Sequence, residues 1–258
     1  MRIVRFSDGD LPAYGVLEDN SERIIVLKGD PLFSPVEPSG RIIDLDDVRL
    51  LSPVIPRSKV VGIGKNYADH IAEMGGETPA APVVFLKPNT SVIGPDDPIV
   101  LPSWSNEVHH EAELAVVIKT LAKNISVEDV DSVILGYTCA NDVTARDCQR
   151  NDGQWSRAKG FDTSCPLGPW ITVDPDLDVD NLQITCRVDG QIRQHDSTSS
   201  MITPVRELVS YASQIFTLLP GDVIITGTPS GIGPIEKGQR VEVEIEGIGV
   251  LSNPVFAS

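Results

Sequence analysis

The alternation of hydrophobic and polar positions predicts a series of short strands at the start of the chain. Residues 1 to about 55 contain the strand-like segments MRIVRF, AYGVLED, ERIIVLKG and RIIDL, with turn clusters such as the Pro-rich DPLFSPVEPSG between them. Pro53 and Pro56 mark a boundary, after which KVVGIG has the continuous apolar character of a buried strand. We therefore predict a small β-rich N-terminal domain over residues 1–56 and a larger domain over residues 57–258 that carries the chemistry.

The segment VHHEAELAVVI, residues 108–118, predicts the central strand of the large domain. Successive side chains of a strand point to opposite faces, so Glu111 and Glu113 point the same way. Beyond them both faces are apolar, which is typical of a strand that is buried on both sides. Glu113 then lies at the edge of a low-dielectric interior, where an unpaired carboxylate is costly. We expect a cation beside it.

A second segment shows that the spacing of these glutamates is weak evidence by itself. VEVEIEG has the same Glu-x-Glu spacing, but its other face alone is apolar, as in a strand with one solvated side. The pair at Glu111 and Glu113 differs through its doubly apolar continuation and through a third acid, Asp142, in the strand-like segment YTCANDVTARD. For a Glu-x-Glu pair alone, a solvated face stays the simpler interpretation.

A short helix is predicted in KNYADHIAEMGGE, with Asn66 as its N-cap and two glycines that end it. His70 and Glu73 are three residues apart and therefore adjacent on one side of this helix. Taken alone, they indicate a surface ion pair. The two glycines after so short a helix also indicate a segment that turns sharply and can move.

The longest predicted helix lies in TPVRELVSYASQIFTLL, where Thr203 is the cap and Pro204 takes the first position. Its apolar stripe predicts core packing without a chemical role. Asp189-Gly190 predicts a hairpin turn. The segment RNDGQWSRAKGFDTSCPLGP has no periodicity and predicts a long functional loop that contains Lys159. Lys87, at the end of a strand, is expected to be exposed to solvent.

Nucleotide binding is not supported, because the chain contains neither GxGxxG nor a Gly-x4-Gly-Lys-Ser/Thr pattern. A loop with Gly227, Gly231 and Gly233 follows a predicted buried strand, and its backbone N–H groups could approach an anion. A tight connection explains those glycines equally well. Polar residues crowd the end of the YTCANDVTARD strand, as is common at functional sites.

Composition restricts the classes of partner. The formal net charge of −16 comes from scattered acidic residues, which argues against nucleic acid and anionic membranes as partners. The four cysteines form no C-x-x-C pair and do not resemble a disulfide framework. No apolar stretch approaches the length of a membrane span, and the first residues lack the apolar core of a signal peptide. We expect a cytoplasmic protein.

Three carboxylates without an obvious Cys/His set describe an oxygen-rich site, which suits Mg²⁺ or Mn²⁺ better than Zn²⁺ or Cu²⁺. By strand alternation His109 shares a face with Glu111 and Glu113. We therefore keep His109 as a candidate that contacts the metal ligands without binding the metal itself.

Six segments, in this order along the chain, resemble the fumarylacetoacetate hydrolase family: GKNYADHIAEM, FLKPN, HHEAELAVVI, NDVTARD, RAKGFDTSCPLGPW and LLPGDVIITGTPSGIGP. They span nearly all of residues 58–254. The resemblance implies an α+β, mostly β fold, a mixed β-sandwich roll with a few peripheral helices, and usually a homodimer. The short N-terminal domain and KNYADH are most similar to bacterial acylpyruvate hydrolase and oxaloacetate decarboxylase-like members and to 2-hydroxyhepta-2,4-diene-1,7-dioate isomerases.

The resemblance also implies roles for individual residues. The family's metal ligands match Glu111, Glu113 and Asp142, which agrees with the strand argument. The family's catalytic residues match His70, Glu73 and Lys159. Its substrate contacts match Arg146, Gln149 and Thr228.

The implied reaction is cleavage of a C–C bond in a short 2-oxo acid by a Mg²⁺- or Mn²⁺-dependent hydrolase or decarboxylase, through an enolate stabilised by the metal. In acylpyruvate hydrolysis, Glu73 orients His70, which takes a proton from the attacking water, and Lys159 adds electrostatic stabilisation. Decarboxylation of oxaloacetate needs no such water.

Two alternatives stay open. One is a 2-hydroxyhepta-2,4-diene-1,7-dioate isomerase or 5-oxopent-3-ene-1,2,5-tricarboxylate decarboxylase of aromatic catabolism. The other is a non-catalytic metal-binding dimer scaffold, against which the joint presence of His70, Glu73 and Lys159 argues.

Overall fold

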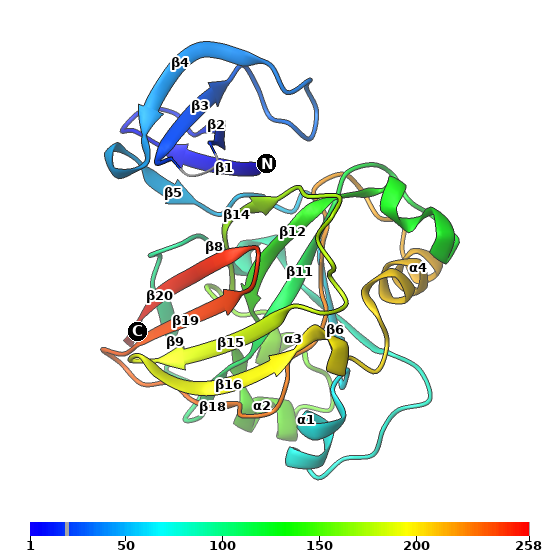
Figure 1. The fold of residues 1–258 in the computed structure, drawn as a ribbon. Helices are drawn as coiled ribbons and strands as arrows, with labels where there is room; N and C mark the ends of the chain where they lie inside the picture. The colour runs from blue at the N-terminus through cyan, green and yellow to red at the C-terminus, as the bar shows by residue number, and fades with distance from the viewer. Residues whose placement is uncertain (19–20, 258) are drawn as a thin grey trace.

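The computed structural model describes residues 1–18 and 21–257, and these residues form mostly β-strands with a few short helices, as the resemblance implied (Figure 1). The strands belong to three sheets. Within the described part of the chain, no helix has the length and apolar character needed to cross a membrane.

The N-terminal segment forms the upper lobe in Figure 1, and four of its five strands, β1 to β4, overlap the predicted ones, whereas β5 was not predicted. Its elements are β1 (Arg2–Ser7), β2 (Ala13–Leu17), β3 (Arg23–Leu27), β4 (Pro38–Asp44), the 3-10 turn η1 (Leu45–Asp47) and β5 (Arg49–Leu51). Asp19, the last residue of the predicted AYGVLED strand, lies outside the described residues. The lobe has a small core of its own around Val4 and Phe6. Because β1 pairs with β14, the lobe continues the large sheet instead of forming a separate one.

The large sheet has the strand order β4-β3-β2-β1-β14-β12-β11-β17-β6-β7, with β5 and β8 beside this path. Its remaining strands are β6 (Val60–Gly64), β7 (Val83–Lys87), β8 (Val92–Ile93), β11 (Ala112–Ile118), β12 (Ile134–Asn141), β14 (Cys165–Thr172) and β17 (Val223–Ile225). β11 pairs antiparallel with both β12 and β17, and β17 pairs parallel with β6.

A five-stranded sheet packs against the large sheet, and a three-stranded sheet lies at its edge (Figure 1). The five-stranded sheet contains β9 (Ile99–Leu101), β15 (Gln183–Val188), β16 (Gln191–Ser197), β19 (Arg240–Ile245) and β20 (Gly249–Ala257). The three-stranded one contains β10 (Val108–His110), β13 (Thr144–Ala145) and β18 (Gly233–Pro234). The predicted hairpin at Asp189-Gly190 is confirmed, and β19 alternates between buried and less buried positions, as predicted for VEVEIEG.

The helices are α1 (Ala68–Glu73), α2 (Arg146–Asn151), α3 (Ser156–Lys159) and α4 (Val205–Ile215), with the 3-10 turns η2 (Asn89–Ser91), η3 (Val127–Ser132) and η4 (Thr198–Ser200). Both predicted caps are wrong. Pro204, not Thr203, precedes α4, and Tyr67 precedes α1. The Asn66 side chain instead donates to the carbonyls of Thr203 and Thr226, so it ties the start of α1 to two distant loops.

The strand β11 is buried on both faces, as its sequence predicted. Leu114, Val116 and Ile118 pack into the core shared with the five-stranded sheet. Ala115 and Val117 pack into the core on the opposite side. The prediction of one continuous strand over residues 108–118 is wrong, because Val108–His110 and Ala112–Ile118 belong to different sheets. Glu111 occupies the junction between the two strands.

The predicted long loop over residues 150–169 is only partly a loop. α3 lies inside it, and the last residues of the segment already belong to β14. The short helix presents Lys159 from its final position, where it is buried. A helical turn holds a side chain more rigidly than an irregular loop does, so Lys159 has a fixed place in the structure.

Candidate active site

The strand directions bring the predicted site residues to one edge of the large sheet. β12, β17 and β6 all end where β11 begins, because β11 runs antiparallel to β12 and β17 while β6 runs parallel to β17. The residues that follow these three strands therefore meet the start of β11. This edge collects the predicted residues from segments that are far apart in the sequence: His70, Glu73, Glu111, Glu113, Asp142, Arg146, Gln149, Lys159 and Thr228.

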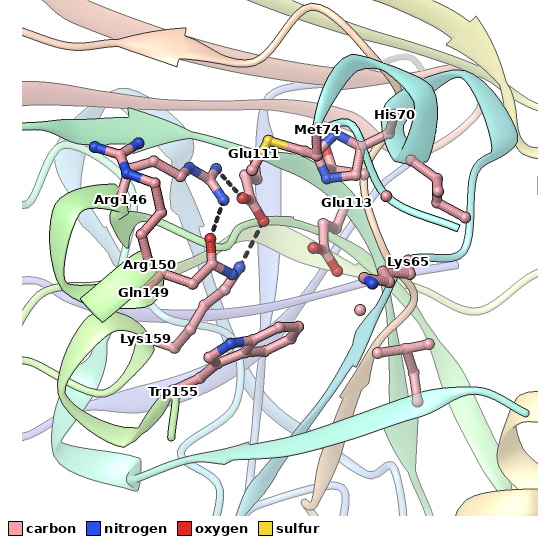
Figure 2. A pocket seen from close by; sticks show the side chains of 15 residues that line it. Lys65, His70, Met74, Glu111, Glu113, Arg146, Gln149, Arg150, Trp155 and Lys159 are labelled. Atoms are coloured by element: carbon pink, nitrogen blue, oxygen red, sulfur yellow. Dashed lines mark hydrogen bonds and ion pairs between the residues drawn. The ribbon is translucent and has the colours of Figure 1, made fainter. Parts of the chain in front are cut away.

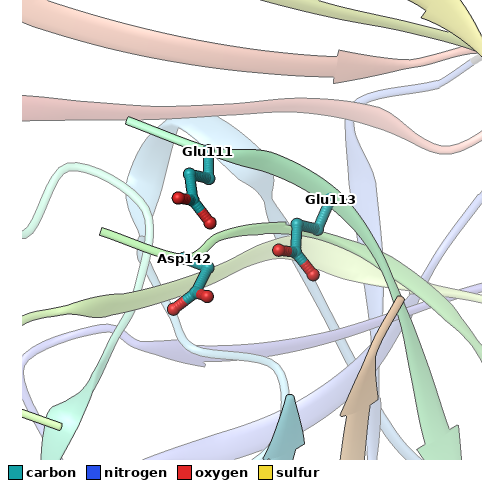
Figure 3. Close-up of side chains that lie close together, drawn as sticks. All are labelled: Glu111, Glu113 and Asp142. Carbon is teal, nitrogen blue, oxygen red and sulfur yellow. The ribbon is translucent and has the colours of Figure 1, made fainter. Parts of the chain in front are cut away.

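The three predicted metal ligands lie together. The carboxylate groups of Glu111, Glu113 and Asp142 each offer an oxygen within 4.8 Å of the others, and all three side chains are buried (Figure 3). The register explains this cluster, because Ala112 pairs with Asn141 and the Asp142 amide donates to the Glu111 carbonyl at 2.9 Å. Asp142 thus stands across from Glu111, one strand away.

Buried cations neutralise two of the three acids. Lys159 Nζ lies 2.7 Å from Glu111 Oε2 and 2.5 Å from Asp142 Oδ2. Arg146 makes a further ion pair with Glu111. Lys87 Nζ lies 2.5 Å from Asp142 Oδ1, and this side chain is 1% exposed. The expectation that Lys87 is solvent-exposed is therefore wrong: the strand end points it into the protein.

Glu113 is the acid with the least compensation. It accepts one hydrogen bond from the Gly227 amide at 2.7 Å, and no ion pair to it is found within residues 1–18 and 21–257. Burial, together with repulsion from Asp142 and Glu111, raises the pKa of Glu113 well above its usual value. Burial alone also raises the pKa of Glu111, but the neighbouring Lys159 and Arg146 lower it overall.

These residues fit a divalent cation. The donors are all carboxylate oxygens, which Mg²⁺ and Mn²⁺ prefer. Glu113 is buried and faces two like charges, and a bound ion would offset the burial and the repulsion that raise its pKa. Glu111, Glu113 and Asp142 would hold that ion.

The predicted His–Glu pair is formed at the cavity wall. His70 Nδ1 lies 3.2 Å from Glu73 Oε2, and Glu73 Oε1 accepts a hydrogen bond from the Gly231 amide at 3.0 Å. Glu73 is therefore held from both sides. With Nδ1–H donating to the carboxylate, the other ring nitrogen of His70 is left as the basic one. His70 is buried, unlike a residue of a surface ion pair.

The cavity between these groups has a volume of about 210 Å³ (Figure 2). Its walls include His70, Glu111, Glu113, Arg146, Gln149, Lys159 and Thr228, together with Lys65, Met74, Arg150 and Trp155. A cavity of this size suits a small organic acid. Arg146 also donates to Gln149, so two of the three predicted substrate contacts are joined to Glu111.

Gln194 is a polar residue of this region that the sequence did not indicate. It comes from β16 of the five-stranded sheet and is 1% exposed. Its Oε1 accepts from the Ala112 amide at 3.0 Å and contacts His110 Nδ1 at 3.1 Å, while its Nε2 donates to Thr228 Oγ1 at 2.7 Å. Gln194 therefore joins the start of β11 to a predicted substrate contact. Its strand, QIRQHDS, is polar except for Ile192, so no pattern marked Gln194 as buried.

The expectation for His109 is wrong. Its Nε2 lies 3.1 Å from Glu107, and among the described residues it makes no hydrogen bond to the three acids. The break in the strand at Glu111 removes the alternation on which the prediction relied. His110 is the buried member of the pair, and burial lowers its pKa to about 4, so its ring is neutral at pH 7.

A deep carboxylate cluster, beside a His–Glu pair and a buried lysine in a small cavity, defines a candidate active site for a small acid. The model of the fumarylacetoacetate (FAA) hydrolase C-terminal region matches residues 59–256, so the chain belongs to the fumarylacetoacetate hydrolase family. A second model, Rv2993c-like, N-terminal, matches residues 1–53.

Two relatives illustrate the range of this family. Protein Rv2993c of Mycobacterium tuberculosis is 51% identical over 260 residues, which cover 99% of this chain and 98% of that protein. The mitochondrial oxaloacetate tautomerase Fahd2a of Rattus norvegicus is 45% identical over 206 residues, which cover 76% of this chain and 66% of that protein.

Solved structures agree with the fold. The 5-carboxymethyl-2-hydroxymuconate delta-isomerase of Mycobacterium smegmatis superimposes with a TM-score of 0.92 at 47% identity, over 100% of both chains. The fumarylpyruvate hydrolase of Pseudomonas aeruginosa, in complex with Mn²⁺ and pyruvate, has a TM-score of 0.75 at 34% identity, over 81% of this chain and 92% of that one. The named relatives are therefore an isomerase, a hydrolase and a tautomerase.

Proposed function

We propose that this chain is a Mg²⁺- or Mn²⁺-dependent enzyme that interconverts the enol and keto forms of a short 2-oxo acid of the oxaloacetate type. The observation that carries the proposal is the buried triad of Glu111, Glu113 and Asp142, of which Glu111 and Glu113 line a cavity of about 210 Å³ together with His70. The oxaloacetate tautomerase and the delta-isomerase are 45% and 47% identical to this chain, and the fumarylpyruvate hydrolase is 34% identical. These identities favour proton transfer over bond cleavage.

When bound at the triad, a divalent cation supplies a Lewis acid for the 2-oxo group. The chain supplies the remaining functions. Arg146, Gln149 and Thr228 line the cavity with hydrogen-bond donors that bind and orient the acid. Lys159, from its fixed place at the end of α3, stabilises negative charge that develops next to it.

His70 carries out the proton transfer. In the tautomer set by Glu73, its free ring nitrogen accepts a proton from the enol or from C3 of the keto acid and returns it at the other position. Glu73 holds the ring in place through its second bond to the Gly231 amide. The burial of His70 limits exchange of this proton with bulk water.

The test is an ultraviolet assay of the conversion of enol-oxaloacetate to the keto form. We expect Mg²⁺ to support catalysis, EDTA to abolish it, and His70→Asn to reduce the rate by about 10²- to 10⁴-fold. His195→Asn is the matched control, because His195 contacts Thr185 outside the cavity and its replacement should leave the rate unchanged. A rate that is indifferent to EDTA would contradict the proposal, and absence of turnover on any 2-oxo acid would favour a metal-binding scaffold.

Cleavage of a C–C bond is the second candidate. The His70–Glu73 pair has the geometry to activate a water molecule as well as to move a proton on the substrate, and the related fumarylpyruvate hydrolase binds Mn²⁺ and pyruvate. Pyruvate release from oxaloacetate, acetylpyruvate or fumarylpyruvate separates the candidates. Release faster than tautomerisation would make this chain a decarboxylase or hydrolase.

A further inference from the structure

Lys65 is an unpaired cation in the wall of the candidate active site. The other cationic side chains that line the cavity have acidic partners: Lys159 pairs with Glu111 and Asp142, Arg146 with Glu111, and Arg150 with Glu107. For Lys65, no hydrogen bond or ion pair is found within the part of the chain that the structure describes. The residue is half-buried and lines the cavity, where its side chain is available to an anion.

The backbone holds Lys65 in an unusual conformation. Its φ is +59°, in the left-handed region that favours glycine, and a side chain there costs free energy. The next residue, Asn66, fixes this geometry, since its carbonyl accepts from the Ile202 amide at 2.8 Å and its side chain bonds to Thr203 and Thr226. Lys65 is therefore anchored at its base although its ammonium group has no partner.

The position of Lys65 separates it from the other donors. In Figure 2 it lies on one side of the cavity, next to Glu113, whereas Arg146, Gln149 and Arg150 lie on the opposite side. Glu111 and Glu113 stand between these two sides. A ligand that reacts beside the acids and is held by Arg146 or Gln149 at one end therefore meets Lys65 at its other end.

The overall charge of the protein makes such a cation necessary for a dianionic ligand. The formal net charge is −16, which repels anions over the whole surface. An ammonium group without an internal partner compensates for this repulsion locally. It also does so selectively, because a ligand with an uncharged far end gains no ion pair from it.

We propose that Lys65 binds the second carboxylate of a short dicarboxylic 2-oxo acid and thereby selects diacids over monoacids. This inference rests on the proposed function, since it names the substrate class of the same site. Arg150 is the alternative residue that could bind this carboxylate, but it already pairs with Glu107 near the protein surface.

The test compares binding of malate, an inert analogue of oxaloacetate, with binding of its 4-methyl ester, by calorimetry on the Mg²⁺-loaded protein. The two ligands differ only at the far end, where the ester lacks the charge and carries an added methyl group. We expect the unmodified protein to prefer malate by about 10- to 100-fold, the range expected for a hydrogen bond to a charged group. Lys65→Met should abolish most of this preference, and Lys65→Arg should keep it.

Three further variants make the result specific. Lys237→Met removes an exposed lysine elsewhere and should behave as the unmodified protein does. Arg150→Met should keep the preference, and its loss there would assign the subsite to Arg150 and overturn the proposal. Lys65→Gly removes the side chain while suiting the positive φ, so a loss of preference in this variant as well cannot be ascribed to misfolding.

Equal binding of malate and the ester by the unmodified protein, or an undiminished preference in Lys65→Met, would overturn the proposal. Because binding is read without turnover, the two proposals fail separately. A protein that prefers malate through Lys65 but does not act on oxaloacetate contradicts only the proposed function. A tautomerase whose preference survives Lys65→Met contradicts only the role of Lys65.

Discussion

The ammonium group of Lys159 lies 2.5 Å from Asp142 Oδ2, and both side chains are buried. The lysine therefore compensates a carboxylate that is also a predicted metal ligand. Burial alone lowers the pKa of Lys159, but the adjacent Asp142 and Glu111 raise it overall, so the side chain is charged at neutral pH. A cation bound at the triad shares these carboxylates with Lys159.

Replacing Lys159 with Met should therefore have consequences that depend on the metal. Removing one partner of a buried ion pair costs about 3–5 kcal/mol of the free energy of unfolding. We expect a loss of this size in EDTA and a smaller one with Mg²⁺, because the bound ion supplies the missing positive charge. Turnover should fall by about 10²- to 10³-fold.

Lys59→Met is the matched control for this measurement. Lys59 Nζ lies 2.5 Å from the buried Asp222, away from the residues that line the cavity. Its replacement should destabilise the protein equally with and without Mg²⁺. If urea denaturation shows that Lys159→Met also loses the same unfolding free energy with and without Mg²⁺, the role of Lys159 is structural and our account of this lysine is wrong.

Glu113 gives the metal-free protein a distinct dependence on pH. Its pKa in the folded state is raised above the usual 4.5, so the folded state binds its proton more tightly than the unfolded state does. The stability from this group is present below pH 4.5 and is lost as the pH rises through the folded-state pKa. Mg²⁺ binding requires the ionised carboxylate, so the affinity for Mg²⁺ should rise with pH over the same interval.

Glu113→Gln isolates this effect, because the amide keeps an acceptor for Gly227 but does not titrate. Between about pH 5 and about pH 8 in EDTA, we expect the variant to lose less unfolding free energy than the unmodified protein does. It should also bind Mg²⁺ far more weakly. Parallel stability curves for the two proteins would show that Glu113 is ionised in the metal-free fold.

Gln194 should affect substrate binding although it lies outside the cavity lining. Gln194→Leu leaves the Ala112 amide and the Thr228 hydroxyl without their buried partner, which should cost about 2–4 kcal/mol of unfolding free energy. Because Thr228 lines the cavity, KM should rise at least about tenfold while kcat changes less. Gln183→Leu, at an exposed position of the neighbouring strand β15, is the control. A loss of stability without a change in KM would confine Gln194 to a structural role.

The sequence was sufficient for the features that depend on local spacing. Glu111 and Glu113 lie close together as predicted, although Glu111 stands just before β11 and not within it. Helix spacing placed His70 beside Glu73. The doubly apolar continuation correctly indicated that β11 is buried on both sides. The burial of β11 and the His70–Glu73 pair each follow from the pattern within a single element and need no knowledge of its neighbours.

The missed features depend on how distant elements meet. Lys87 is buried because β7 ends beside Asp142, and Gln194 is buried because the middle of β16 contacts the start of β11; nothing in the polarity of either segment shows this. The break at Glu111 moves β10 into another sheet, so alternation misplaced His109. Likewise the Asn66 side chain serves two remote loops instead of its own helix. Here tertiary hydrogen bonds outweigh the local preference for a cap.

The most direct test of the central claim is the anomalous diffraction of a crystal grown with Mn²⁺. We predict an anomalous peak within coordination distance, about 2.1 Å, of carboxylate oxygens from Glu111, Glu113 and Asp142, and loss of this peak in a crystal of Glu113→Gln. A peak elsewhere, or no peak while Lys159 alone continues to bridge Glu111 and Asp142, would contradict the claim that these acids form a metal site.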